Sequence, residues 1–325
     1  MKNNCLKPTE WRDAIGSCRF RRVRTGGRGL RLGIAGMKVV AHVGVKDEVD
    51  LIGSCIRHLA SIGIDQTIVC DLGSSDGTLD VLEGLSGDGL DVVRAVDLDL
   101  EDIEAFKMRN VEMVKRTAAD WVIFLDADER WLPATGRIKD CMSLDVHDVL
   151  SVSRFNVVLS DEAIDLPILP TVEQYGSVLL HVRQVDDFRA RFEAGTAPPW
   201  CRNVPVPKIM ARPSMIDSIG TGGHSVNGCE GTRLRTAVPA DLLIAHLPFT
   251  TPQRFSGKIR NLGRMLDAHN EYFVAGMAWH WRKWSELNSE AEIVAEFKRQ
   301  IVTQEEIGSL RSSGAVRSAA EMLHG

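Results

Sequence analysis

Three acidic residues follow one apolar run in the segment WVIFLDADERWLP, residues 121–133. The apolar run predicts a strand buried on both faces, and Asp126 and Asp128 then stand in the turn with one residue between them. Paired carboxylates in that position suit a hard divalent cation, because Mg²⁺ and Mn²⁺ prefer oxygen ligands and complete their shell with water and phosphate. The same pattern is also typical of a helix N-cap or a solvated turn. An EF-hand is excluded, since the loop lacks the Gly and the terminal Glu of that motif.

The elements around this segment alternate between strand and helix. Strands are expected over 37–45, 66–70, 90–96 and 121–125, with helices over 48–62, from about Thr78, and over 102–118. This alternation predicts a mainly parallel sheet with right-handed crossovers, and ligands bind outside the carboxyl ends of such strands. The acids that would gather at that edge are Asp47, Glu48, Asp71, Asp76, Asp126 and Asp128.

The rhythm changes after about residue 133. Strand-like pieces at 149–158, 178–185 and 206–212 are separated by loops rich in Pro and Gly, and residues 193–207 cannot be regular structure. A short strand follows in LLIAHLP, and Thr251 with Pro252 is a well-formed helix start. A last helix is expected from the capping box at 289–292 through Ile301.

The composition is that of a soluble globular chain, with 44% hydrophobic and 26% charged residues among 325. Apolar runs of about five residues are far shorter than the roughly 20 that span a bilayer, so no transmembrane helix is expected. The seven cysteines are odd in number and form no CxxC pair, which favours a reducing cytoplasm, with Cys55 and Cys70 as small core residues. Nucleic acid is not an expected partner.

The N-terminal residues 1–36 are strongly basic. They hold nine Lys or Arg against two acids, a net charge of about +7, and they show neither strand nor helix period. We expect a flexible tail that either contacts an acidic membrane surface, at the inner face of the membrane, or is a dispensable start, because Met37 opens the first convincing strand.

Two blocks of sequence carry a family resemblance. VGVKDEVDLIGSCIRHLASIGIDQTIVCDLGSSDGT and, further on, FKMRNVEMVKRTAADWVIFLDADE resemble the family 2 glycosyltransferases of the GT-A fold in their order and spacing. The resemblance covers roughly residues 37–270. It implies a mainly parallel sheet flanked by helices, an irregular acceptor-side region and C-terminal helices. The resemblance also divides the chain into three parts. These are a nucleotide-sugar-binding half over 37–135, an acceptor-side half of the same domain over 136–250 and a helical segment over 251–325.

The resemblance assigns the nucleotide-base end of a site. The loop from Val43 through Val45 to Glu48 looks like the base pocket. Asp71 matches the Asp that recognises a uracil ring, and Asp76 lies in the matching loop. An Asp can accept a hydrogen bond from an imide N–H. By its own sequence, Asp71 is equally suited to forming a turn.

The resemblance also assigns the metal and diphosphate end. Asp126 and Asp128 match the metal-binding acids, Asp128 being the more direct ligand. Arg109 matches an Arg near the diphosphate, for which its planar fork is suited. The alternative for Arg109 is a surface charge that pairs with a neighbouring Glu. The family more often has Asn where this chain has Asp47, which is a departure from the pattern.

Two later stretches resemble a subgroup of that family, in which the DADE acids are joined by a C-terminal His motif. In GTGGHSV and IAHLPFTTPQRFSGKIRN, the subgroup pattern implies that His246 is a third metal ligand or diphosphate donor, and that His224 does similar work. A lone His is otherwise a common structural residue. Lys208 and Lys258 are candidate contacts for phosphate or acceptor. The cluster WHWRKW at 279–284 suggests an acceptor, lipid or partner contact, and a packed helix end explains it equally well.

The implied activity is an inverting, metal-dependent transfer of a sugar from a nucleotide donor, with a UDP-sugar expected, to a glycan or glycoconjugate acceptor. Metal and Arg would neutralise the leaving diphosphate while a hydroxyl attacks from the opposite face. The general base is expected after the metal acids, with Glu193 and Asp217 as candidates and Asp161 and Glu162 as further ones.

Two other functions stay open at this point. A sugar nucleotidyltransferase would use a Gly-rich basic loop after the first strand, whereas VGVKDEVD is acidic and holds one Gly. A non-catalytic carbohydrate- or partner-binding module would retain the fold without the chemistry.

Overall fold

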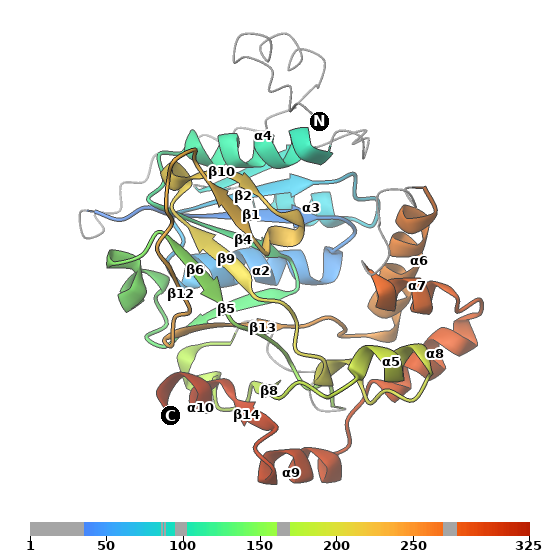
Figure 1. Cartoon of the computed structure of the whole chain (residues 1–325). Helices are drawn as coiled ribbons and strands as arrows, with labels where there is room; N and C mark the ends of the chain where they lie inside the picture. Colours follow the sequence, from blue (N-terminus) through green and yellow to red (C-terminus); the bar gives the residue numbers. More distant parts are fainter. Residues whose placement is uncertain (1–35, 86, 88, 95–102, 161–169, 269–277) are drawn as a thin grey trace.

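Two of the apolar runs become neighbouring strands at the centre of a seven-stranded sheet. β1 (Val39–Val45) pairs in parallel with β4 (Trp121–Asp126) on one side and with β2 (Gln66–Asp71) on the other. The strand order is β12-β6-β9-β4-β1-β2-β3, in which β9 runs antiparallel to both neighbours and the other pairs are parallel. The predicted α/β class, with a mainly parallel sheet flanked by helices, is confirmed (Figure 1).

The computed structural model describes residues 36–85, 87, 89–94, 103–160, 170–268 and 278–325. The predicted basic tail lies outside this range apart from Gly36, as do Asp161 and Glu162. The other strands are β3 (Leu90–Arg94), β5 (Glu129–Pro133), β6 (Val149–Val152), β7 (Arg154–Asn156), β8 (Leu179–His181), β9 (Lys208–Ala211), β10 (Ile216–Ile219), β11 (Val226–Gly228), β12 (Thr236–Ala237), β13 (Leu242–His246) and β14 (Val316–Ser318). The α-helices are α2 (Val49–Ser61), α3 (Thr78–Gly84), α4 (Ile103–Lys115), α5 (Phe188–Glu193), α6 (Pro252–Ala268), α7 (Trp279–Ser285), α8 (Glu290–Arg299), α9 (Gln304–Ser312) and α10 (Ala319–His324).

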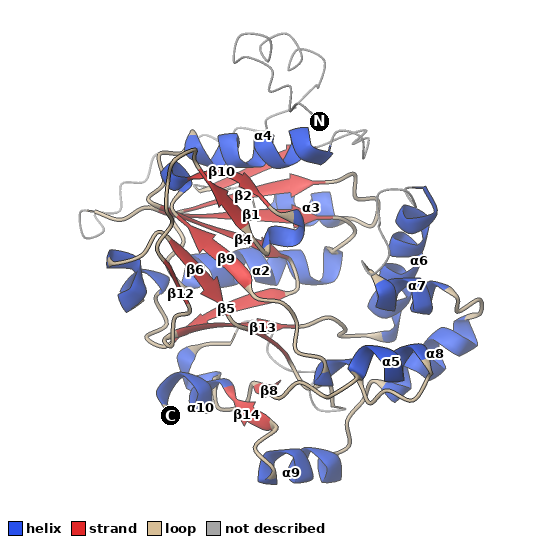
Figure 2. Ribbon diagram, viewed as in Figure 1, coloured by secondary structure: helices blue, strands red, loops and turns tan. Residues whose placement is uncertain are grey.

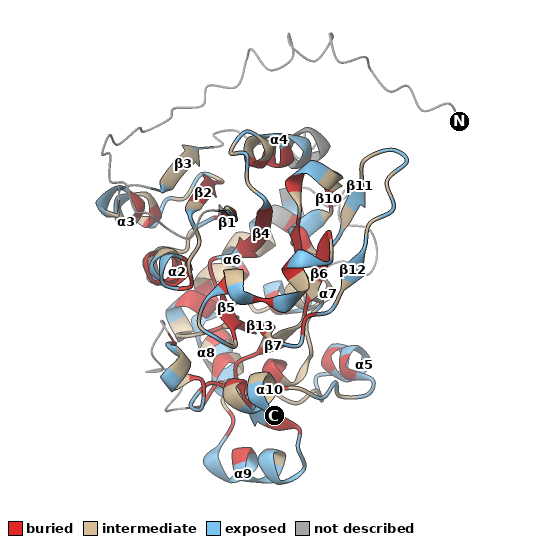
Figure 3. Ribbon diagram, turned by 90° about the vertical axis from the view of Figure 1, so that its left-hand side faces the viewer, coloured by how far each residue is buried: buried red, intermediate tan, exposed pale blue. Residues whose placement is uncertain are grey.

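Alternate side chains of the central strands face two separate cores. Val39, Ala41 and Val43 of β1 pack with α2 on one face, whereas Val40 packs on the other face with residues of α4. This follows from the two-residue period of a strand, and it explains why β1 is apolar throughout. Figure 2 shows the helices on the two sides of the sheet, and Figure 3 shows the buried central strands.

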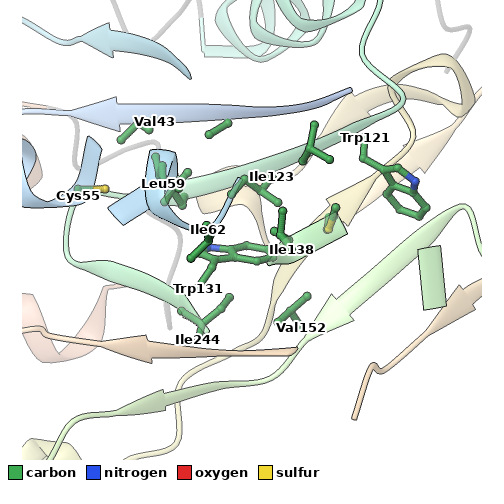
Figure 4. Close-up of a cluster of buried hydrophobic side chains, with 14 of the residues drawn as sticks. Val43, Cys55, Leu59, Ile62, Trp121, Ile123, Trp131, Ile138, Val152 and Ile244 are labelled. Carbon is green, nitrogen blue, oxygen red and sulfur yellow. The ribbon is translucent and has the colours of Figure 1, made fainter. Parts of the chain in front are cut away.

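A second, three-stranded sheet lies beyond α2, in the order β5-β13-β7. Trp131 of β5 and Ile244 of β13 point into the same core as Val43 and Leu59, so the two sheets share one apolar layer (Figure 4). In the register of this sheet, His246 stands between Glu129 of β5 and Asn156 of β7. The pairing therefore places the end of β13 beside the turn that carries the acids.

The C-terminal helices pack on an aromatic cluster. Phe188 and Phe192 of α5, Trp200, Phe255 of α6 and Trp284 of α7 belong to one buried group. Most of the residues of WHWRKW are thus part of a packed helix, as one of the two interpretations predicted. No helix among the described residues is long and apolar enough to cross a membrane.

Several local expectations are confirmed. Cys55 and Cys70 are buried in the core, and Ser289 caps α8 in a reciprocal capping box. Other elements differ from the prediction. The expected strand over 149–158 is two short strands that belong to different sheets, and α8 is followed by α9, β14 and α10. The seven-stranded sheet combines strands from residues 37–135 and 136–250.

An ion pair between a buried acid and an exposed Arg closes the β12 edge of the large sheet. Asp148, 3% exposed, accepts hydrogen bonds from the Arg235 backbone N–H at 3.0 Å and from its guanidinium at 2.8 and 2.9 Å. These bonds lower the pKa of Asp148 to about 2. The carboxylate thus holds the chain where β12 joins β6.

We predict that Asp148→Asn lowers the free energy of unfolding by about 1–3 kcal/mol, because a hydrogen-bonded charge is removed from a buried position. Since the folded pKa is depressed, this contribution is present above the ordinary Asp value and is lost as the pH falls towards 2. Urea unfolding at pH 7 and at steps below pH 5 measures both effects. Asp145→Asn, which changes an exposed acid of the neighbouring 3₁₀ turn, is the control. Equal losses in the two variants would contradict the assignment.

Candidate active site at the carboxyl ends of the strands

The turn between β4 and β5 is held by a buried charge network. Glu129, 0% exposed, accepts from Arg154 at 2.6 Å and lies 3.4 Å from the Lys208 ammonium. It also accepts the backbone N–H of Asp126 at 3.1 Å. Lys208, 1% exposed, donates to the Asp126 carboxylate at 2.7 Å. Burial raises the pKa of Glu129, an effect that Lys208 opposes.

Arg130 points to the opposite side of the turn. It is buried, and it donates to the backbone oxygens of Ala127 and Glu129 at 2.9 and 3.0 Å and to the Ser54 hydroxyl of α2 at 2.7 Å. Successive side chains of a strand face opposite ways, so Arg130 and the Glu129 carboxylate diverge. Glu129 therefore contacts Asp126, Arg154 and Lys208 and holds these three residues in position.

Asp128 receives its counter-charges from α6. The carboxylate is 2% exposed, and its Oδ2 accepts from Lys258 and, at 3.3 Å, from Arg254. Arg254 also donates to Glu48 at 2.7 Å, which joins α6 to the N-terminus of α2. Although burial acts in the other direction, Lys258 holds the pKa of Asp128 well below its ordinary value. Asp128 is thus a carboxylate at neutral pH.

The other oxygen of Asp128, Oδ1, is buried and has no hydrogen-bond partner. It lies 3.6 Å from His246 Nε2. His246 Nδ1 is 2.7 Å from Asn156 Oδ1, and the Asn156 amide N donates to the carbonyl oxygens of Asn203 at 2.6 Å and Trp200 at 3.3 Å. Two carbonyl acceptors fix the orientation of the Asn156 amide, so His246 Nδ1 must be the donor.

It follows that His246 turns a lone pair towards Asp128. Burial lowers the pKa of His246 to about 4, so at neutral pH the ring is uncharged and Nε2 carries no proton. A buried carboxylate oxygen and a ring nitrogen, both acceptors, then face each other at 3.6 Å, an arrangement that a divalent cation with one nitrogen and one oxygen ligand would satisfy. This donor pair fits Mn²⁺ or Mg²⁺, with further ligands from water and a phosphate.

Asp126 is set apart from this pair. Its carboxylate, half exposed, is turned to Lys208. Among the described residues, no group of three or more His, Cys, Asp or Glu side chains is arranged to hold a metal ion. The three predicted ligands Asp126, Asp128 and His246 therefore do not converge, and the structure brings together only the last two.

One face of α6 lines the rim of acids. This face carries Arg254, Lys258 and Asn261 at helical spacing. Arg254 and Lys258 each lie within ion-pair distance of both Asp128 and Glu48, whereas Asn261 contacts Asp47. Asn261 donates to Asp47 at 2.8 Å. Arg254 keeps two buried nitrogens, Nε and Nη1, without a partner.

The predicted base-end residues have structural roles. Val43 and Val45 lie in β1 with side chains in the core, so their side chains are not available to a ligand. Asp71, 0% exposed, accepts from the backbone N–H groups of Gly73 and Ser74, the turn-forming role that its sequence also allowed. Its contact with uracil stays a prediction.

Asp76 joins the starts of two helices. It accepts from the Thr78 N–H and hydroxyl at 3.0 and 2.6 Å and from the Val49 N–H at 3.0 Å. Although partial burial acts against it, the bonds from Thr78 keep the pKa of Asp76 below its ordinary value. Arg109 stands on α4, half-buried, near Cys70 at the end of β2.

His224 belongs to a Gly-rich loop that rests on β4. Its Nδ1 donates to the Pro207 carbonyl at 2.8 Å, which leaves Nε2 as the acceptor, and burial lowers its pKa. Lys208 and Asp126 are among its charged neighbours. Gly223, with φ +71°, lets the loop approach Phe124 so closely that an added Cβ would lie 2.9 Å from it. His224 therefore lies near the Asp126 side of the candidate site, and its functional role stays a prediction.

The two candidate bases are elsewhere. Glu193, at the end of α5, forms an exposed ion pair with Arg189 at 2.8 Å. Asp217 is exposed on β10, a strand that packs against α4. No described interaction joins either carboxylate to the network around Asp126 and Asp128, and their catalytic role stays a prediction.

Sequence reasoning missed three residues of the site: Arg154, Asn156 and Arg254. The helix start at Thr251 gave a usable signal for Arg254, because it stands one turn before Lys258 on the same face. Asn156 and Arg154 are placed by the pairing of β13 with β7, and the local sequence gives no signal for this long-range pairing.

Comparisons with known proteins give limited matches. No family model and no curated protein sequence matches the chain. A solved structure of glucosyl-3-phosphoglycerate synthase from Mycobacterium tuberculosis, in complex with Mn²⁺, UDP and glucosyl-3-phosphoglycerate, is similar with 15% identity and a TM-score of 0.32 over 59% of this chain and 63% of that one. The same enzyme with Mn²⁺, UDP-glucose and phosphoglyceric acid gives 17% identity and a TM-score of 0.32, with the same coverage. A structure described as a mycobacterial protein gives 16% and 0.35 over 71% of this chain and 74% of that one. The chain thus spans less than two thirds of the first of these structures.

We predict that Gly223→Ala destabilises the protein more than Gly231→Ala. Both residues have a positive φ, +71° and +72°, so the backbone strain of about 1–2 kcal/mol is shared. A Cβ at Gly231 meets nothing within 4 Å, whereas one at Gly223 meets Phe124, and such overpacking costs about 1–3 kcal/mol more. Urea unfolding of the two variants measures the difference. Equal losses would show that the loop does not rest on β4.

Proposed function

We propose that the protein is a metal-dependent glycosyltransferase that moves a sugar from a nucleotide donor to an acceptor hydroxyl. The observation that carries this proposal is a pair of acceptors, the buried Asp128 Oδ1 and His246 Nε2, which face each other at 3.6 Å, together with the unpartnered nitrogens of Arg254, whose guanidinium also contacts Asp128. The two acceptor atoms would be satisfied by a cation, and the unpartnered nitrogens of Arg254 by an anion. A metal ion with a diphosphate supplies both.

The formal charges of the site support a joint ligand. Four carboxylates are paired with four basic side chains: Glu48, Asp126, Asp128 and Glu129 with Arg154, Lys208, Arg254 and Lys258. A divalent cation or a diphosphate alone would unbalance this set in a largely buried place. A divalent metal ion and a nucleotide sugar together add about zero net charge. We therefore expect the metal ion to bind more tightly to the nucleotide-bound protein than to the free protein, and the nucleotide to bind more tightly to the metal-bound protein.

The residues then divide the work. Asp128 and His246 would hold the metal, which acts as a Lewis acid on the diphosphate oxygens. Lys258 and Arg254 stand where they can transfer their hydrogen bonds from Asp128 to the phosphates and stabilise the charge of the leaving group. Lys208 keeps the Asp126 side of the turn in place. A hydroxyl that attacks from the opposite face inverts the anomeric centre in one displacement.

UDP is the expected nucleotide, on the resemblance of the Asp71 and Asp76 loop to the family's uracil site. Asp71 would have to exchange a bond to Gly73 or Ser74 for one to the base. The similar mycobacterial structures contain UDP, UDP-glucose and phosphoglyceric acid, and a hexose is the sugar we propose for transfer. We further propose that the protein belongs to glycosyltransferase family 2 and is located in the cytoplasm. Its proposed product is a cell-surface polysaccharide, a lipopolysaccharide or another glycoconjugate.

We predict that UDP binds at least tenfold more tightly with MnCl₂ than with EDTA, and that Asp128→Asn abolishes this metal dependence. The isosteric change removes one metal ligand while leaving Lys258 and Arg254 free to attract the nucleotide, so binding without metal should not weaken. Isothermal titration of UDP into both proteins measures it. Asp145→Asn, an exposed acid, is the control and should behave as the unmodified chain.

The same proteins test the activity and its rivals. Release of UDP from a panel of UDP-sugars in the presence of Mn²⁺, lost in Asp128→Asn, supports transfer. Pyrophosphate release from UTP and a sugar 1-phosphate would instead identify a nucleotidyltransferase. If no nucleotide binds with metal dependence, the binding-module function replaces our proposal. Glu193→Gln and Asp217→Asn show by their turnover whether either acid is the base.

A further inference from the structure

The four basic side chains of the candidate site are not buried to the same extent. The side chains of Lys208, Arg254 and Arg154 are 1%, 5% and 10% exposed, whereas that of Lys258 is 21% exposed. Solvent therefore reaches part of the Lys258 side chain, and the other three are enclosed by protein. Of the four, Lys258 is the one with room to change its partner.

Lys258 is also the principal counter-charge of Asp128. Its ammonium donates to Asp128 Oδ2 and lies 3.8 Å from the Glu48 carboxylate. Arg254 contacts the same Asp128 oxygen at 3.3 Å, but its shorter bond, at 2.7 Å, goes to Glu48. The two cations of α6 thus divide the acids between them, with Lys258 on Asp128 and Arg254 on Glu48.

The ammonium competes with a metal ion for this carboxylate. Asp128 Oδ1 faces His246 Nε2 at 3.6 Å, the proposed metal position, while Oδ2 accepts from Lys258. Both oxygens belong to one carboxylate, so a divalent cation at Oδ1 would stand beside the ammonium at Oδ2. Like charges at such short range repel, and the repulsion is stronger in a largely buried place than in water. A metal ion alone therefore gains little from Asp128 while Lys258 stays there.

Lys258 can leave Asp128 without a movement of α6. The helix is anchored in the aromatic cluster by Phe255 and Ile259, which are 0% and 3% exposed. The ammonium, in contrast, stands on a flexible four-carbon stem. Rotation about the bonds of this stem can carry it from Oδ2 to a phosphate oxygen, which is a strong acceptor for a charged donor.

We propose that Lys258 makes metal binding conditional on the nucleotide, because its ammonium is the built-in counter-charge of Asp128 and is released only when a diphosphate accepts it. The inference rests on the proposed function and adds its regulation. The balance of charges in the whole site predicts that metal and nucleotide strengthen each other's binding, and the contacts of Lys258 assign this coupling to one side chain.

The test measures binding of Mn²⁺ without nucleotide. Isothermal titration of MnCl₂ compares the unmodified chain with Lys258→Met, which keeps the length of the side chain and removes its charge. Asp128 is then buried without its closest partner, so we expect Mn²⁺ to bind at least about tenfold more tightly to the variant. The factor by which UDP strengthens Mn²⁺ binding should fall correspondingly.

Two further variants control for charge and for chemistry. Arg260→Met removes one positive charge from an exposed position of the same helix, where Arg260 is 62% exposed and pairs with Glu290, and it should change neither quantity. Lys258→Arg retains the charge and should bind Mn²⁺ as weakly as the unmodified chain.

Thermal unfolding gives a second readout. In EDTA, Lys258→Met should melt at a lower temperature than the unmodified chain, and MnCl₂ alone should raise its melting temperature by more. If Lys258→Met does not fold, Lys258→Gln, which keeps a hydrogen-bond donor without the charge, takes its place in both measurements.

The outcomes separate the inference from the proposed function. Unchanged Mn²⁺ affinity in the uncharged variant, or an undiminished effect of UDP on Mn²⁺ binding, overturns the role of Lys258. Absence of metal-dependent UDP binding in the unmodified chain overturns the proposed function instead.

Discussion

The ammonium of Lys208 is the charge on which the candidate site depends. It is almost fully buried beneath the turn between β4 and β5, where it meets Asp126 and Glu129. Because it belongs to β9, the strand that runs against its neighbours, it ties the central sheet to the turn. Removing one partner of such a group leaves an uncompensated buried charge, at a cost of about 3–5 kcal/mol. The network thus fixes the backbone that carries Asp128, while Asp128 itself is left to other partners.

Those partners come from α6, and they give the site its second half. Lys258 and Arg254 approach the acids from outside the sheet, so the site combines the turn between β4 and β5 with a cationic face of α6. His246 is fixed differently, through a chain of hydrogen bonds that runs from Trp200 and Asn203 through Asn156. Each of the two proposed ligand atoms, Asp128 Oδ1 and His246 Nε2, is therefore oriented by an independent set of contacts, as such a role requires.

The parts of the fold and of the candidate site that depend on local sequence signals could be predicted from the sequence. The strand and its three acids lie within nine residues, and the helices α2 and α8 can be recognised from their apolar period and their capping residues. The remainder depends on pairings between distant segments. Glu129 receives Arg154 and Lys208 through strand pairing, whereas its neighbour Arg130, the partner that sequence proximity suggests, lies on the other face. Asp71 shows a further limit, because a turn-forming Asp and a base-binding Asp have the same residue type and position, and only the hydrogen bonds of the folded chain show the first role.

The separation along the chain between the acids and their counter-charges also has a consequence for folding. Asp128 lies 130 residues before Lys258, and Glu48 lies 206 residues before Arg254. During synthesis, β1, β4 and α2 are complete long before α6 leaves the ribosome, so the carboxylates of the rim must remain hydrated until the helix arrives. Contacts of such sequence separation close late and slowly. The rim therefore cannot form before Lys258 has been made, and a nascent chain that has already paired β1 with β4 carries an unbalanced acidic edge until α6 arrives.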